Sequence, residues 1–411
     1  MRIAFFTDTF NEANGVATLS QQLTQFAKER GLPFLAICGG HQTSFTKDGS
    51  LETLELKRGW ASFAVDKGLY YDPLFARHKQ LVMDHLIAFK PDLLHITGPG
   101  DVGILGVWVA HLMGLPSVAS WHTNVHEYLA RRLDRALSFV PKKLRARLIQ
   151  PIEKQTLRGL VRFYKSARFT LAPNETYVDL LRDRNGRPSF LMPHGVDLTQ
   201  YRPGTPPDGS DTGRPFCIGY VGRLTAEKNV RAFVEIDGKL QAAGEQNYRF
   251  LIVGDGGQQR WLQTHLRNAE MAGVLRGQEL AAAYRRMDAF VFPSVTDTFG
   301  LVILEAMASG VPVILAPEAG LRVGVEDGVS GFLSEDFAAG IKCLMHDPAR
   351  RMAMGRAARE FADGHSWDAV FADLYKVYAE RLAQDTKKQR GDGRQETADS
   401  QTSGGVGLNR L

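Results

Sequence analysis

The sequence predicts an α/β protein made of two doubly wound domains, each a parallel sheet covered by helices on both faces. Its 411 residues exceed the roughly 250 to 300 residues at which a single hydrophobic core stops growing. Its composition, with 44% hydrophobic and 23% charged residues, is typical of a globular protein. Short apolar runs alternate with helical patterns in both halves, and one segment rich in Pro and Gly interrupts the alternation.

The first half alternates apolar runs of strand length with longer segments of helical periodicity. These segments are residues 3–6, 17–30, 33–38, 75–89, 93–96, 103–113 and 117–121. Such alternation is typical of a parallel sheet wrapped by helices. The longest apolar stretch, residues 102–121, contains His111 and Pro116, so we expect a helix followed by a strand there and no transmembrane span.

Residues 201–210, which read YRPGTPPDGS, can continue neither a helix nor a strand and mark a domain boundary. Beyond them the alternation restarts with residues 216–221, a helix from Asn229, and residues 248–253, 277–287, 289–292 and 312–315. The predicted parts are an N-terminal domain (1–197), a linker (198–215), a C-terminal domain (216–364), a helix (365–384) and a tail (385–411). The tail has almost no apolar residues to bury, so we expect it to be disordered.

Three segments that follow predicted strands carry candidate ligand-binding residues, because open α/β sheets bind ligands at the carboxyl ends of their strands. The first, residues 7–16, leaves the first strand and opens a helix near Gly15. A glycine lets an anion approach the helix N-terminus, where amide groups and the helix dipole favour phosphate. A simple turn that starts the helix is the alternative interpretation.

The second segment, residues 221–229, reads VGRLTAEKN and lies between a predicted strand and a predicted helix. Its two cations, Arg223 and Lys228, could stabilise the charge that develops on a diphosphate leaving group. A solvated loop in which Glu227 pairs with Lys228 is the alternative.

The third segment, residues 293–313, contains two acids, Asp297 and Glu305, with seven residues between them. One therefore lies at a helix entrance and the other just over two turns into the helix, on roughly the same face. Neither a dinucleotide-binding fingerprint nor a Walker loop occurs in the chain, which counts against an oxidoreductase or an NTPase.

This pair of acids resembles the signature of retaining glycosyltransferases with the GT-B fold, and the chain as a whole resembles glycosyltransferase family 4. The resemblance covers residues 2 to about 381 and includes VGRLTAEKN, IVGDGGQQRWL, GQELAAAYRRMDAFVFPS, FGLVILEAMASGVPVI and EDGVSGFL in this order. It implies two Rossmann-like domains that face each other across a cleft. The acceptor would bind on the N-terminal side and the nucleotide sugar on the C-terminal side.

The resemblance also assigns roles to single residues. It implies that Arg223 and Lys228 bind the diphosphate, that Glu305 binds the ribose hydroxyls and that Asp297 holds the transferred sugar. The other donor-binding residues that it implies are Gly15 at the phosphates, Val274 and Leu275 at the base, and Phe299, Gly300 and Leu301 beside the sugar.

Residues 120–129, which read SWHTNVHEYL, resemble the segment of family members that glycosylate membrane lipids. The resemblance implies that His122 lies over the donor sugar and that a hexose or uronic acid passes from a UDP- or GDP-sugar to a lipid such as diacylglycerol. On residue type alone, His122 could instead be a structural histidine. A soluble or polysaccharide acceptor is the alternative to the lipid.

Two positions depart from the family pattern. The first acid is usually Glu and is Asp297 here, which is one methylene shorter and leaves the donor sugar open. The usual Asn-Gly-Val-Asp at the end of the first domain is His194-Gly195-Val196-Asp197. We expect His194, like His126 and Asp101, to be structural or peripheral.

The family mechanism implies front-face attack with retention of configuration, the leaving diphosphate taking the acceptor proton. We expect neither a metal nor another cofactor, because no Asp-x-Asp occurs and the histidines lack Cys or carboxylate neighbours at ligand spacing.

A nucleotide-sugar epimerase or hydrolase would be the rival enzyme, and the acid pair argues against it. A nucleic-acid-binding protein is the rival that the pI near 9.0 suggests, but the cations lack interleaved aromatic residues.

Cations gather in the first half, between Leu129 and Arg168. The only acids in this segment are Asp134 and Glu153. Its cations are Arg131, Arg132, Arg135, Lys142, Lys143, Arg145, Arg147, Lys154, Arg158, Arg162, Lys165 and Arg168. With the apolar residues among them they predict a basic amphipathic surface that binds an anionic membrane, the alternative being a solvated helix pair. Three well-separated cysteines and the absence of a leader pattern favour a cytoplasmic protein, peripheral on the inner face of the cell membrane.

Overall fold

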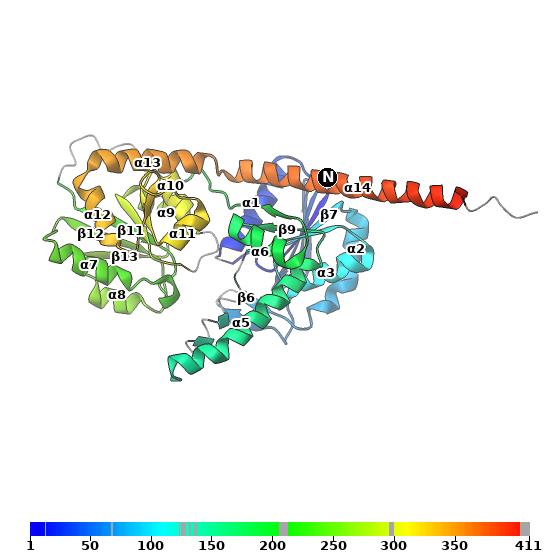
Figure 1. The fold of residues 1–411 in the computed structure, drawn as a ribbon, viewed down its shortest axis with the longest axis horizontal. Coiled ribbons are helices and arrows are strands. Elements are labelled where there is room, and N and C mark those ends of the chain that lie inside the picture. The colour runs from blue at the N-terminus through cyan, green and yellow to red at the C-terminus, as the bar shows by residue number, and fades with distance from the viewer. Residues whose placement is uncertain are drawn as a thin grey trace, which may run out of the picture.

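The computed structural model describes residues 1–12, 14–66, 69–122, 124, 129–130, 133–134, 137, 139–204, 213–295 and 300–402. These residues form two α/β domains, one around an eight-stranded sheet and one around a six-stranded sheet. Figure 1 shows the N-terminal domain on the right and the C-terminal domain on the left. The two doubly wound domains confirm the predicted fold class.

The larger sheet belongs to the N-terminal domain. Its strands are β1 (Ile3–Thr7), β2 (Phe34–Gly40), β3 (Ser44–Asp48), β4 (Leu51–Lys57), β7 (Leu93–Ile96), β8 (Ser117–Ser120), β9 (Phe169–Ala172) and β10 (Ser189–Leu191). They are ordered β10-β9-β8-β7-β1-β2-β4-β3, and only the edge pair β3 and β4 is antiparallel. A separate antiparallel pair joins β5 (Phe63–Asp66) to β6 (Leu69–Tyr71).

Helices cover both faces of this sheet. They are α1 (Gly15–Glu29), the 3-10 turn η1 (Phe75–His78), α2 (Lys79–Phe89), α3 (Asp101–Met113), α5 (Lys142–Lys165) and α6 (Glu175–Asn185). The central strand β1 is buried throughout, with Phe5 in the core shared with α1 and Phe6 in the core shared with α2 and α3. Alternate side chains therefore fill two cores, as expected for a strand covered on both sides.

The C-terminal domain repeats this plan with a wholly parallel sheet. Its strands are β11 (Phe216–Val221), β12 (Tyr248–Val253), β13 (Ala269–Gly273), β14 (Ala289–Phe292), β15 (Val313–Leu315) and β16 (Gly331–Leu333). Its helical elements are η2 (Ala226–Lys228), α7 (Ala232–Ala242), α8 (Gln259–His265), α9 (Gly277–Arg285), α10 (Leu301–Ala308), α11 (Pro317–Val323), α12 (Phe337–His346) and α13 (Pro348–Asp363).

The strand orders identify where each sheet can bind a ligand. The C-terminal sheet is ordered β13-β12-β11-β14-β15-β16, so the chain leaves β11 toward one edge and returns through β14 toward the other. The N-terminal sheet reverses in the same way between β1 and β7. Ligands of open α/β sheets bind at the carboxyl ends of the strands at such reversals.

A long helix, α14 (Trp367–Thr402), returns from the C-terminal domain to the N-terminal domain. Val196 donates its backbone N–H to the His365 carbonyl at 2.8 Å, so the two chain crossings between the domains lie side by side. In Figure 1, α14 runs along the N-terminal domain and extends past it. Its first turns pack on α1 through Trp367 and Phe371.

The structure continues α14 beyond residue 384, where we expected order to end and a disordered tail (385–411) to begin. Residues 385–396 are mostly Lys, Gln, Arg, Asp and Glu. Several of these types have high helix propensity, so a helix that is already packed at its start can propagate through them. Residues 403–411 lie outside the described residues.

Candidate active site

The first and third predicted segments meet between the domains. A Cβ atom on Gly15, at the start of α1, would lie 3.3 Å from Cδ1 of Leu301, the first residue of α10. Gly300 precedes it with φ of 81°, a left-handed conformation that a residue with a side chain adopts at a cost. The N-termini of α1 and α10 therefore face each other, and both can stabilise an anion.

Glu305 lies in the second turn of α10 and is held by tyrosines. The Tyr284 hydroxyl donates a hydrogen bond to Glu305 Oε2 at 2.8 Å, and Tyr201 makes a second hydrogen bond to the same carboxylate. Burial raises the pKa of Glu305, and the two hydrogen bonds partly oppose that rise. We did not predict Tyr201 or Tyr284, which lie in the linker and in α9.

Arg223 and Lys228 lie in the loop after β11. Arg223 donates to Glu227 Oε1 at 2.9 Å, and 55% of its side chain is exposed. The alternative interpretation paired Glu227 with Lys228, and the structure shows an ion pair between Glu227 and Arg223. The Glu227 side chain is only 16% exposed, so solvent weakens this ion pair mainly at its Arg223 end.

One hydrogen bond and one close backbone approach join this loop to its neighbours at the carboxyl edge of the sheet. Asn229 donates its side-chain amide to the Pro293 carbonyl, 3.4 Å away, which brings the second segment to the third. A Cβ on Gly254, after β12, would lie 1.9 Å from the Gly222 carbonyl oxygen. Only glycine allows these loops to cross so closely, so this edge of the sheet is closely packed.

Four further residues were predicted to bind the donor, and two of them lie in the part of the chain that the structure describes. Val274 and Leu275 follow the edge strand β13, where Val274 is 60% exposed and Leu275 packs partly on the core. Asp297 and Phe299 lie outside the described residues. Their predicted roles at the transferred sugar stay predictions.

His122 follows β8 on the N-terminal side of the site. It is 8% exposed, and its Nε2 lies 2.7 Å from Ser120 Oγ. Burial lowers the pKa of His122 well below its usual range, and the neighbouring His194 and His95 lower it further. His122 is therefore neutral at physiological pH, and its Nδ1 has no hydrogen-bond partner among the described residues.

His194 lies directly against His122, with 5.8 Å between the ring centroids, and its other neighbour is the ring of Trp367 at 6.3 Å. Burial lowers the pKa of His194 to about 4. The histidine that replaces the usual Asn thus fills the space between His122 and α14. Asp101 is structural, since it forms a buried ion pair with Arg58 at 2.9 Å, and His126 lies outside the described residues.

Asp8 is a further polar residue at this edge that we did not predict. Its carboxylate accepts backbone hydrogen bonds from Gly100, Val102 and Gly103 at 3.0 to 3.1 Å and so caps α3. Burial and the nearby Asp101 raise the pKa of Asp8 to about 7. The N-terminus of α3 is thus already occupied by a side chain.

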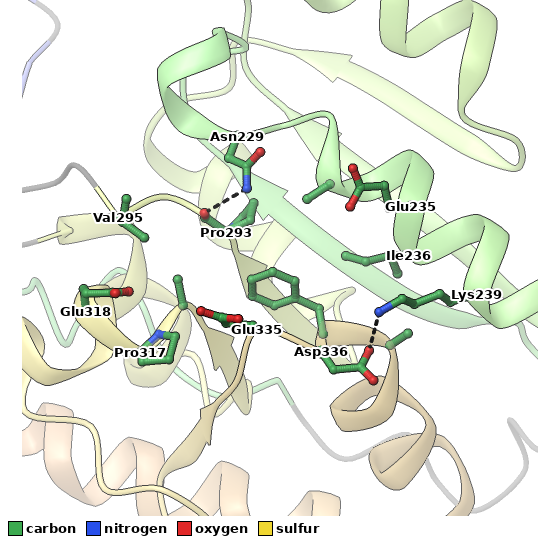
Figure 2. Close-up of a pocket in the computed structure, with 14 residues that line it drawn as sticks. Asn229, Glu235, Ile236, Lys239, Pro293, Val295, Pro317, Glu318, Glu335 and Asp336 are labelled. Carbon is green, nitrogen blue, oxygen red and sulfur yellow. Dashed lines mark hydrogen bonds and ion pairs between the residues drawn. The ribbon is translucent and has the colours of Figure 1, made fainter. Parts of the chain in front are cut away.

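A groove of about 300 Å³ opens between α7 and α12 (Figure 2). Four acids line it, namely Glu235, Glu318, Glu335 and Asp336, and Lys239 pairs with Asp336 at 3.0 Å. None of the predicted donor-binding residues in the described part of the chain lines this groove. Its negative charge is unsuited to a diphosphate.

Two family models match the chain. The one described as Glycosyltransferase Family 4 matches residues 13–200, and the one described as Glycosyl transferases group 1 matches residues 208–361. A GDP-mannose-dependent alpha-mannosyltransferase from Mycolicibacterium smegmatis is 33% identical over 310 residues, 71% of this chain and 74% of the relative. An alpha-monoglucosyldiacylglycerol synthase from Streptococcus pneumoniae is 25% identical over 354 residues, 81% of this chain and 75% of the relative.

Among solved structures, the sucrose-phosphate synthase from Thermosynechococcus elongatus has a TM-score of 0.70 to this chain at 19% identity. The match covers 93% of this chain and 99% of that chain. At this identity the likeness shows the fold, which is GT-B. The family models and the relatives show more: the chain belongs to glycosyltransferase family 4 and is an enzyme that takes a sugar from a nucleotide-sugar donor.

Proposed function

We propose that this enzyme moves a hexose or uronic acid, with retention of configuration, from a UDP- or GDP-sugar to the hydroxyl of a membrane lipid such as diacylglycerol. The reaction takes place at the anionic inner face of the cell membrane, where the protein binds peripherally. Neither a metal nor another cofactor takes part.

The residues at the carboxyl edges of the two sheets support this chemistry. The bond between the sugar and the diphosphate breaks, the acceptor oxygen bonds to the same face of the sugar, and the acceptor proton passes to a diphosphate oxygen. Arg223, Lys228 and the N-termini of α1 and α10 stabilise the charge on the diphosphate. The neutral His122 adds a hydrogen bond to the sugar without adding charge.

The observation that supports a membrane lipid as the acceptor is the exposed face of α5. Leu144, Leu148 and Ile152 are spaced four residues apart, so they form one stripe along the helix. They are 51%, 48% and 41% exposed. At about 100° per residue, the exposed cations Arg147, Lys154 and Arg158 fall on one flank of that stripe.

The same helix connects this surface to the site. Its C-terminal half packs on the domain through Leu160 and Tyr164, and the Tyr164 ring lies 5.0 Å from that of Trp121, the residue before His122. The other half of α5 projects from the domain (Figure 1). Apolar side chains flanked by cations are typical of a helix that lies in the headgroup plane of an anionic membrane.

Vesicle co-sedimentation tests this proposal. The protein should sediment with anionic vesicles, remain in the supernatant with neutral ones, and dissociate as salt is raised. Reversing the charge of Arg147, Lys154 and Arg158 to Glu should weaken binding by at least about 100-fold, because each cation near the surface contributes about 1 kcal/mol. Arg145 is left out, because it contacts Asp134 at 2.6 Å.

A matched control reverses three exposed cations of the C-terminal domain, Arg260, Arg267 and Arg356, with the same change of net charge. This control should bind anionic vesicles like the wild type. If the wild type stays in the supernatant at low salt, or if the α5 reversal leaves lipid glycosylation unchanged, the acceptor is a soluble glycan or small molecule.

A further inference from the structure

Two tyrosine hydroxyls converge on the Glu305 carboxylate from separate elements. Tyr284 of α9 donates to Glu305 Oε2 at 2.8 Å, and Tyr201 of the linker makes a second hydrogen bond to the same carboxylate. Tyr284 is fully buried and Tyr201 is 7% exposed, and their rings meet edge to face with 5.7 Å between the centroids. Glu305 itself is only partly buried, so a ligand can still reach it.

Backbone hydrogen bonds fix Tyr201 relative to the helix that carries Glu305. The Arg359 guanidinium of α13 donates to the Tyr201 carbonyl at 2.9 Å and to the carbonyl of Ala308, the last residue of α10, at 2.6 Å. The Tyr201 N–H donates to the Asp197 carbonyl at 2.9 Å. The linker and α10 are therefore held together beside the carboxylate, and the Tyr201 hydroxyl reaches it from a fixed position.

Each phenol has one proton, and the carboxylate is the best acceptor for it. The Tyr284 hydroxyl also lies 3.2 Å from the Val302 carbonyl, but the bond to Glu305 is shorter. A bond to an ionised carboxylate is also about twice as strong as one between neutral groups. An ionised carboxylate has about four lone-pair sites, so sites remain for hydroxyl donors of a ligand after both tyrosines have donated.

Burial and hydrogen bonding act on Glu305 in opposite directions. Burial raises the pKa of Glu305, and the hydrogen bonds from Tyr284 and Tyr201 lower it. In the part of the chain that the structure describes, no Lys, Arg or His acts on this carboxylate; the nearest charges are Arg359 and Asp197, both at Tyr201. Burial and the Glu305 carboxylate raise the pKa of both tyrosines, so both remain protonated donors.

We propose that Tyr284 and Tyr201 are positioning residues that hold the Glu305 carboxylate, ionised and oriented, as the acceptor for the ribose hydroxyls of the nucleotide donor. This inference deepens the proposed function and rests on Glu305 binding the ribose, the role that the family resemblance implies. Protonation of Glu305 would remove its charge and turn one acceptor site into a donor. Each tyrosine hydroxyl therefore extends donor binding to lower pH.

Calorimetric titration with UDP and with GDP, from about pH 5 to about pH 8.5, tests this inference without any transfer reaction. Tyr284→Phe and Tyr201→Phe each remove one hydroxyl and keep the ring, so the pKa of Glu305 should rise in each. Nucleotide binding should then be lost at higher pH than in the wild type. The ratio of the variant Kd to the wild-type Kd should grow from at most about threefold at the alkaline end to about tenfold at the acid end.

The ratio is compared at each pH because a terminal phosphate itself titrates near pH 6, which affects every variant equally. The matched control is Tyr248→Phe, since Tyr248 is a buried tyrosine that also donates to a carboxylate, Asp237, at 2.5 Å. Tyr248 begins β12 and so lies at the amino edge of the sheet, away from the predicted donor site. This control should bind like the wild type at every pH.

A ratio that does not change with pH in either tyrosine variant, with the protein folded by its thermal unfolding curve, would contradict the proposal. Glu305→Gln separates the possible failures. It should bind at least about tenfold more weakly than the wild type at the alkaline end, with a ratio that shrinks as the pH falls. Wild-type affinity in Glu305→Gln, or binding of neither nucleotide by the wild type, would reject the donor site itself. Weak binding by Glu305→Gln with constant ratios in both tyrosine variants would reject the tyrosines alone.

Discussion

The two sides of the candidate active site differ in the burial and charge of their side chains. On the N-terminal side, His122 is buried, neutral and fixed by hydrogen bonds that extend to α14. On the C-terminal side, Arg223 is charged and its side chain is 55% exposed, while the side chain of its ion-pair partner Glu227 is 16% exposed. Neutral buried groups are fixed before a ligand arrives, whereas exposed charges can exchange partners. In the proposed function, the N-terminal side orients the sugar and the C-terminal side receives the diphosphate.

The largest effect is expected on the charged side. Glu305→Ala and Arg223→Ala should each lower kcat by about 100-fold or more, as the loss of a group that acts in the transition state does. Arg249→Ala is the control, because Arg249 pairs with Glu270 between β12 and β13. Steady-state kinetics with the best donor measure the effect. Activity within a few-fold of the wild type would show that these residues do not bind the donor.

Substitutions of Asp297 test the part of the C-terminal side that is predicted to hold the transferred sugar. Asp297→Asn should be more damaging than Asp297→Glu, because the first removes the charge and the second restores the length that is usual in the family. Both variants are compared by kcat with the same donor. The reverse order would mean that this side chain does not hold the transferred sugar.

His194 tests whether the N-terminal side is kept neutral. Burial lowers the pKa of His194 to about 4, so below its usual value the unfolded chain binds a proton that the folded chain does not. Stability therefore falls as the pH falls. The free energy of unfolding of the wild type relative to His194→Asn should drop by about 1.4 kcal/mol per pH unit from about pH 6 to pH 4.5. A difference measured by urea unfolding that does not change with pH would contradict a buried neutral ring.

The smallest effect is expected from chelation. If Arg223, Lys228 and the helix N-termini supply the positive charge, transfer activity should be unchanged in EDTA. The comparison is made at saturating donor with and without chelator. Loss of activity that magnesium or manganese restores would mean that a metal shares the diphosphate.

The fold could be predicted because its strands are short, wholly apolar and separated by helical patterns. β1 and β11 are buried at every position, and residues 102–121 form helix α3 and then β8, as predicted. The edge hairpin of β3 and β4 was not predicted. β3 is largely exposed and polar, so its sequence lacks an apolar run. Among the described residues, no helix is both long and apolar enough to cross a membrane.

The site could be predicted only where a motif surrounds it. Gly15, Arg223, Lys228 and Glu305 lie in loops or helix starts that follow strands, where position alone suggests a ligand. The residues that hold them could not be found in this way. Tyr378 is 283 positions from His95, and its contact depends on how α14 docks. Tyr201 and Tyr284 meet at Glu305 only because the linker crosses α9.

The proposal that sugar is transferred to a membrane lipid is tested most directly by product analysis. Purified protein is incubated with a panel of UDP- and GDP-sugars and anionic vesicles containing diacylglycerol, and the lipid fraction is analysed by mass spectrometry. The proposed function predicts a new glycosylated diacylglycerol with one donor, absent with Glu305→Ala. Release of free nucleotide, or glycosylation of a soluble acceptor, with no glycosylated lipid from any donor would contradict it.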